Sequence, residues 1–100
     1  GIFEGMTHAE IEAADPAAMD GLRHDKWNYR PPEGESYVML AARVAHWWAT
    51  TTGDMVIVSH GGTFRALRIA IEDNHDPALA VLYVPQDRIF RWQDDRGAWL

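Results

Sequence analysis

The sequence contains no cysteine, which excludes a disulfide framework and a thiolate zinc site. It has no apolar run long enough to cross a bilayer, and no charged-then-apolar leader. A net charge of −6 argues against nonspecific binding to nucleic acid. We therefore expect a cytoplasmic protein without a membrane or a nucleic acid as partner.

The apolar content is ample for a small core. A hydrophobic fraction of 47% with 11% aromatic residues argues against disorder, and 100 residues make at most one domain. Because the sequence opens with Gly1 rather than Met, we expect residues 1–100 to form a single, partial domain of a longer protein. Given the negative net charge, an anionic substrate would need a local positive pocket.

The most informative stretch joins a short apolar run to a helical pattern. Residues 55–58 are rich in β-branched side chains and are bounded by glycines, which predicts a buried strand. Residues 63–72 contain good helix formers with apolar positions on one face, which predicts a helix. His60, Gly61 and Gly62 are therefore expected in a tight turn between the two. Open α/β sheets bind ligands at this position, and a helix N-terminus attracts anions.

The remaining pattern places helices before this stretch and strands after it. Thr7 and Glu10 form a capping-box pattern for a helix that ends at Ala14, and Ser36 caps a longer amphipathic helix. The other expected elements are a short helix at 17–22, an ordered loop at 23–34, a turn at 73–77, a helix running into a strand at 78–84, a strand at 89–92, a hairpin turn at 94–97 and a last strand at 98–100. This order predicts an α/β fold with too few strands for a complete sheet.

The other histidines are expected to be structural. His24 follows Arg23, as a nucleophilic His would, but it has no preceding β-run and no following Gly. His8 and His46 lie in predicted helices, and His75 lies in a polar turn. No pair has the spacing of a helical metal site, so we expect no metal.

Several charged and aromatic residues have two interpretations. Glu35 stands at a helix start, where it either complements the helix dipole and orients an Arg, or lines a substrate pocket. Tyr37, with Trp27 and Tyr29, is a candidate to border a substrate mouth. The expected roles of four others are structural: Glu4, and Arg43, Arg65 and Arg68 on solvated helix faces or in salt bridges.

The order of these blocks resembles the histidine phosphatase superfamily, the phosphoglycerate-mutase-like group. The resemblance covers nearly the whole chain, and Phe3 replaces the Trp that is more usual in its first block. The blocks are Phe3-Glu-Gly5, Glu10-Ile11, Pro31-Pro-Glu-Gly-Glu-Ser36 followed by Arg43, and Val56-Ile-Val-Ser-His-Gly-Gly62 followed by Arg65.

The resemblance implies a three-layer α/β/α sandwich and phosphoryl transfer through a phosphohistidine, without a metal or organic cofactor. In the family, the histidine that matches His60 stabilises the transferring phosphoryl group, and the glycines that match Gly61 and Gly62 lie at the phosphate pocket. Glu35 and Tyr37 are the further candidates for substrate or phosphate binding. The family's nucleophilic His, in an Arg-His-Gly motif, and its acid–base Glu have no match here. The sequence thus resembles the C-terminal half, and this chain alone is expected to be inactive.

The leading functional hypothesis is a phosphatase that acts on small phosphorylated substrates in the full-length protein. The short Pro31–Ser36 loop offers little material for a closing lid, which favours hydrolysis over a phosphoglycerate-mutase-type transfer. A non-catalytic phosphate-binding or interaction module is the alternative from another class. The isolated chain is expected to expose a sheet edge, which invites self-association.

Overall fold

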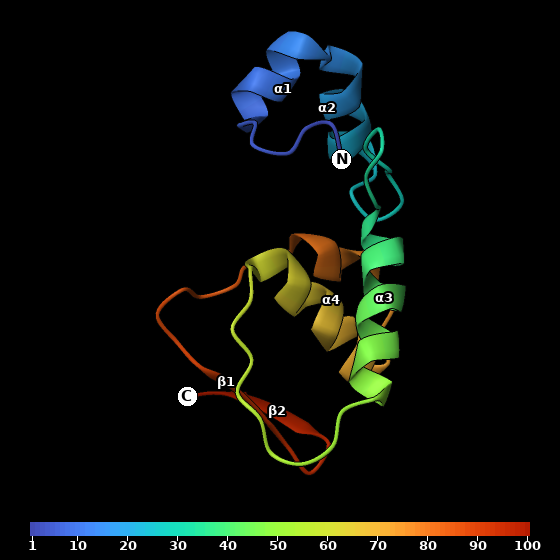
Figure 1. Cartoon of the computed structure of the whole chain (residues 1–100). Helices are drawn as coiled ribbons and strands as arrows, with labels where there is room; N and C mark the ends of the chain where they lie inside the picture. Colours follow the sequence, from blue (N-terminus) through green and yellow to red (C-terminus); the bar gives the residue numbers. More distant parts are fainter.

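Four α-helices, one 3-10 helix and a single β-hairpin make up the regular structure. The computed structural model describes all residues, 1–100, with principal extents of 45 × 27 × 23 Å. Figure 1 shows α1 and α2 paired at one end, α3 and α4 side by side in the middle, and the hairpin toward the other end. The elements are α1 (His8–Ala14), α2 (Pro16–His24), α3 (Tyr37–Ala49), α4 (Gly61–Glu72), the 3-10 helix η1 (Pro77–Val81), β1 (Phe90–Gln93) and β2 (Arg96–Trp99).

The helix starts follow from their capping residues. The predicted capping box at α1 is confirmed: Thr7 Oγ1 accepts from the N–H of Glu10 at 3.2 Å, and the Glu10 carboxylate accepts from the Thr7 N–H at 2.6 Å. Ser36 Oγ caps α3, as predicted, by accepting from the N–H of Met39 at 3.2 Å. Helix α2 is longer than the expected 17–22, because Asp15 caps it and Pro16 fits the first helical position, where no N–H is needed.

The core lies between α3 and α4. Ala41 and Val44 of α3 meet Ala66 and Ile69 of α4, and these four side chains are buried. Small side chains at the contact let the two helix axes approach closely. Trp27, Leu40, Leu67 and Leu79 pack around this cluster. The contact fixes the start of α4 relative to the start of α3.

The prediction of a buried strand at residues 55–58 is wrong. The backbone of residues 52–59 makes no hydrogen bond with any other part of the chain. The exposed fractions of Met55, Val56, Ile57 and Val58 are 42%, 93%, 40% and 94%. This alternation has the period of an extended backbone, but a strand also needs a neighbour to pair with, and no segment pairs with this one. The strand expected at the end of 78–84 is absent as well, since η1 is followed by irregular chain.

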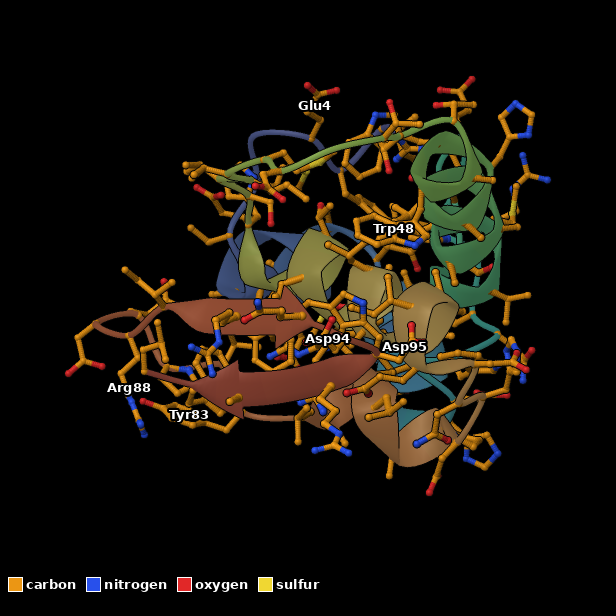
Figure 2. All side chains as sticks on the ribbon, turned by 90° about the horizontal axis from the view of Figure 1, so that it is seen from below. Glu4, Trp48, Tyr83, Arg88, Asp94 and Asp95 are labelled. Atoms are coloured by element: carbon orange, nitrogen blue, oxygen red, sulfur yellow. The ribbon has the colours of Figure 1, made fainter.

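The C-terminal hairpin is confirmed, with its bounds shifted by one or two residues. Gln93 pairs with Arg96 across a two-residue turn, and the turn residues Asp94 and Asp95 have φ values of 53° and 57°. Positive φ at both positions is what a type I′ turn requires. Figure 2 shows these two aspartates at the turn, with Arg88 and Tyr83 toward the other end of the hairpin.

An aromatic cluster holds the hairpin against α4. The ring centroids of Phe64, Phe90 and Trp99 are 5.2 to 5.3 Å apart. Edge-to-face and tilted arrangements at this distance are favourable beyond the area they bury. The chain therefore combines packed helices with a two-stranded antiparallel sheet, in agreement with the predicted α/β class. None of its helices has both the length and the apolar character needed to span a bilayer.

Two isoleucines test where the stability resides. Ile69 is 1% exposed in the α3–α4 contact, whereas Ile89 is 70% exposed beside the hairpin. We expect Ile69→Ala to lower the free energy of unfolding by about 2–5 kcal/mol, because it leaves a cavity. The control, Ile89→Ala, should change it by less than about 0.5 kcal/mol. Urea denaturation followed by circular dichroism measures both, and equal losses would contradict this location of the core.

Candidate functional site

His60 occupies the N-cap position of α4, the place that the sequence predicts for it, although no strand leads into it. Its backbone is extended, with φ −70° and ψ 156°, and its side chain makes no capping hydrogen bond. The side chain is exposed. Because a helix leaves its first N–H groups without an intrahelical acceptor, the N–H groups of Gly61, Gly62 and Thr63 are free here. The first turn of α4 therefore presents donors and the positive end of a twelve-residue helix.

The two glycines differ in their surroundings. A Cβ added at Gly61 would meet only Val84, at an ordinary 3.8 Å. A Cβ added at Gly62 would lie 3.1 Å from Tyr37 Oη, which is closer than normal contact. Tyr37 is the first residue of α3, so the packing of α3 on α4 brings its hydroxyl against the first turn of α4. The structure thus places the Tyr37 hydroxyl beside Gly62, in the helix turn that His60 and Gly61 begin.

Positive charge gathers around Tyr37 despite the net charge of −6. Arg65 Nε donates to the carbonyl of Leu82 at 2.6 Å, and its Nη1 donates to Tyr37 Oη at 3.3 Å. Lys26 Nζ lies 5.6 Å from the centroid of the Tyr37 ring, within cation–π distance. These cations and the start of α4 supply the local positive region that an anionic ligand needs.

The arginines divide into two groups. Arg43 and Arg68 form salt bridges with Glu35 and Glu72, as predicted. Arg65 is part-buried and forms no salt bridge, so the prediction of a solvated or carboxylate-paired side chain is wrong for it. Arg65 lies three residues after Gly62, and residues three apart share a helix face, so the sequence could have placed Arg65 beside the first turn of α4. No sequence pattern near Arg65 indicates that its side chain bonds to the carbonyl of Leu82.

The structure places Glu35 in a cavity that His60 does not line. The cavity measures about 240 Å³ and lies between α1, α2 and the Pro31–Glu35 loop; its walls include Phe3, Ile11, Met19, Leu22 and Tyr29 but not His60, Gly61 or Gly62. Arg43 Nε donates to the Glu35 carboxylate at 3.2 Å. That hydrogen bond, opposed by partial burial, holds the pKa of the Glu35 carboxyl below its ordinary value. A role for Glu35 in ligand binding stays a prediction.

The remaining candidates lie away from the start of α4. Figure 2 shows Glu4 pointing away from the molecule, although it also borders the cavity that Glu35 lines, so its expected structural role stays a prediction. His8, His24 and His46 are exposed on helices, and His75 is exposed in a turn with Asp73 as its hydrogen-bond partner at 3.1 Å. No group of three His, Asp or Glu side chains is placed to hold a metal ion.

Together, these contacts can bind an oxyanion. The free N–H groups of the first turn of α4 point at a ligand placed beside His60, and the Tyr37 hydroxyl lies next to them. In its protonated form, the imidazole of His60 would add a charge at the same place. The arrangement suits a phosphoryl group, whose charge is spread over several oxygens.

The ion pair of Glu35 generates a prediction about pH. Because its pKa is lowered in the fold, the pair stabilises the protein above the ordinary pKa of Glu, and this contribution is lost as the pH falls through the lowered value. We expect Arg43→Gln to raise the Glu35 pKa toward its ordinary value, whereas Arg68→Gln should leave it unchanged. Carboxyl ¹³C NMR titration measures both shifts. An unmoved Glu35 pKa in Arg43→Gln would show that Arg43 is not its cause.

Comparisons with known proteins identify the family of the chain. The family model of the histidine phosphatase superfamily (branch 1) matches residues 1–96. A 6-phosphofructo-2-kinase/fructose-2,6-bisphosphatase from Arabidopsis thaliana is 28% identical over 96 residues, which cover 93% of this chain and 13% of that protein. A glucosyl-3-phosphoglycerate phosphatase from Mycolicibacterium vanbaalenii is 36% identical over 83 residues, covering 71% of this chain and 36% of that protein. No solved structure matches the chain significantly.

The chain thus spans only 13% and 36% of the lengths of these two curated relatives. The family match nevertheless extends over almost every residue and includes all the blocks that carried the resemblance. The names of both relatives include a phosphatase activity, and the first also names a kinase activity. The predicted resemblance is confirmed, and the chain belongs to the histidine phosphatase superfamily (branch 1).

Proposed function

We propose that the full-length protein is a phosphatase that hydrolyses small phosphate monoesters through a phosphohistidine. The observation that carries the proposal is the first turn of α4, where the free N–H groups of both glycines lie beside the Tyr37 hydroxyl and His60 is the N-cap residue. Membership of the histidine phosphatase superfamily supports it, as do the names of the relatives. No metal or organic cofactor enters this chemistry.

In the proposed reaction, this chain supplies the electrostatic part. A nucleophilic imidazole, expected upstream of Gly1 from the resemblance, attacks phosphorus while the ester P–O bond breaks. The alcohol leaves with a proton from the family's acid–base Glu, which is expected outside this chain and takes a proton back from water in the second step. Water then attacks the phosphohistidine, the P–N bond breaks, and inorganic phosphate is released. In both steps negative charge develops on the phosphoryl oxygens, which the N–H groups of α4 and protonated His60 stabilise.

Glu35 has a separate role in this proposal. Its carboxylate, which is ionised at neutral pH and hydrogen-bonded to Arg43, accepts hydrogen bonds but offers none to a phosphoryl oxygen. It therefore suits hydroxyl groups of the substrate better than the phosphoryl group. The cavity that it lines is also bordered by apolar side chains of α1 and α2, which would contact the carbon skeleton of a substrate.

Exchange of His60 tests the proposed reaction. We expect His60→Ala to lower kcat for a generic aryl phosphate by roughly a hundredfold or more, because the transition state loses a positioned charge. The matched control is His75→Ala, since His75 is exposed and contacts only Asp73. Both variants are assayed in the full-length protein. Undiminished hydrolysis in His60→Ala would remove His60 from the mechanism.

The proposal extends to the complete fold. Unpaired backbone at residues 52–59 borders a groove of about 910 Å³, whose opposite wall is the segment at 84–92. Apolar side chains line it, among them Phe64, Leu67, Phe90 and Trp99. We propose that residues 55–58 become a sheet strand in a three-layer α/β/α sandwich of a cytoplasmic protein, with residues 1–100 as part of one domain. Burial on both faces would then match the uninterrupted apolar run.

In the isolated 100-residue chain, we propose that a second copy covers this groove. Val56 and Val58 are 93% and 94% exposed next to unpaired backbone groups, which is a template for strand pairing between chains. We expect size-exclusion chromatography with light scattering to show self-association that weakens in Val56→Lys/Val58→Lys. Ala13→Lys, on the exposed face of α1, is the charge control. A stable monomer of the unaltered chain would contradict the proposal.

A further inference from the structure

Arg65 joins three segments that lie far apart in the sequence. Its guanidinium donates to the carbonyl of Leu82 just after η1, and to the hydroxyl of Tyr37 at the start of α3. Arg65 itself lies one turn into α4. The side chain is part-buried, and no carboxylate neutralises it. Burying part of a charge without a counter-ion costs free energy, and only the hydrogen bonds to these two neutral oxygens offset that cost here.

The hydrogen bond to Tyr37 has a defined direction. A guanidinium has only donors, so Tyr37 Oη must be the acceptor. The proton of the hydroxyl is then left for another acceptor, and the structure contains no acceptor for it. Because the oxygen would lie 3.1 Å from a Cβ at Gly62, the hydroxyl stands directly over the first turn of α4.

We propose that Arg65 is a positioning residue that holds the Tyr37 hydroxyl as a hydrogen-bond donor to a phosphoryl oxygen bound at the first turn of α4. This inference rests on the proposed function and deepens it, because it assigns how that site recognises the phosphoryl group. Tyr37 contacts the substrate, whereas Arg65 acts through Tyr37. The bond to Leu82 fixes the guanidinium plane, which in turn fixes where the hydroxyl proton points.

The alternative is that Arg65 binds the phosphoryl group directly. The structure favours the indirect role, because two of the guanidinium nitrogens are already engaged by neutral oxygens of the protein. A direct contact and an indirect one differ in a measurable way. If Arg65 acts only through the hydroxyl, its replacement has no further effect once that hydroxyl is removed.

A double-mutant cycle in the full-length protein tests the inference. The variants are Tyr37→Phe, Arg65→Lys and the double variant, with Arg68→Lys as a matched control on the same helix. Arg68 bonds to Glu72 and lies over the Phe90 ring, and it makes no hydrogen bond to Tyr37 or Leu82. Lysine keeps the charge but lacks the fixed fork of donors that reaches both oxygens. The measured quantities are the inhibition constant of inorganic phosphate and the KM and kcat for an aryl phosphate.

We expect each single variant to raise the inhibition constant of phosphate by roughly tenfold, as for one charge-assisted hydrogen bond. The double variant should be no weaker than Tyr37→Phe, and Arg68→Lys should resemble the unaltered protein. Additive losses in the double variant would overturn the positioning role, and an unchanged inhibition constant in Tyr37→Phe would overturn the donor role. Circular dichroism checks folding; if Arg65→Lys does not fold, Tyr37→Phe alone still decides the donor role.

The experiments distinguish a failure of the proposed function from a failure of the role assigned to Arg65 and Tyr37. If the unaltered full-length protein neither hydrolyses the aryl phosphate nor binds phosphate, both the function and this inference fall. If it hydrolyses the substrate and loses activity in His60→Ala, but Tyr37→Phe is unchanged, only this inference falls.

Discussion

The contact between α3 and α4 is the constraint on which the rest of the structure depends. Ala41 and Val44 interlock with Ala66 and Ile69, and these small and medium side chains set the distance between two rigid helices. The first residue of α3 and the second residue of α4 lie at the near ends of that pair. Tyr37 therefore stands over Gly62 because of packing that takes place further along both helices.

Charge is distributed unevenly around this contact. The chain carries a net charge of −6, yet the start of α4 is surrounded by Arg65, Lys26 and the free N–H groups of the helix. Glu35 is neutralised by Arg43 and lies in the neighbouring cavity. An anion is consequently favoured at the start of α4, while Glu35 offers a hydrogen-bond acceptor in the cavity beside α1 and α2. This separation suits a ligand with one phosphoryl group and a polar, partly apolar remainder.

The segment at residues 52–59 shows how local preference and long-range pairing diverge. Its β-branched residues and its alternating exposure both suit an extended backbone. The hydrogen bonds that would make it a strand need a neighbour from elsewhere in a sheet, and hydrophobic pattern alone cannot supply one. By contrast, the hairpin at the C-terminus forms because its two strands adjoin in sequence and its Asp-Asp turn adopts the required positive φ.

The sequence by itself determined the features whose partners lie within a few residues. These include the Thr7 and Ser36 caps, the amphipathic α3 and α4, the hairpin, the position of His60 at a helix start, and the family. Only the tertiary structure decided that Arg65 reaches over 17 positions to Leu82 and over 28 to Tyr37, that Glu35 lines a separate cavity, and that residues 55–58 stay unpaired. The physical reason is that capping and helical periodicity depend on residues a few positions apart. Long-range side-chain hydrogen bonds and sheet pairing instead join segments whose separation in space is fixed by packing.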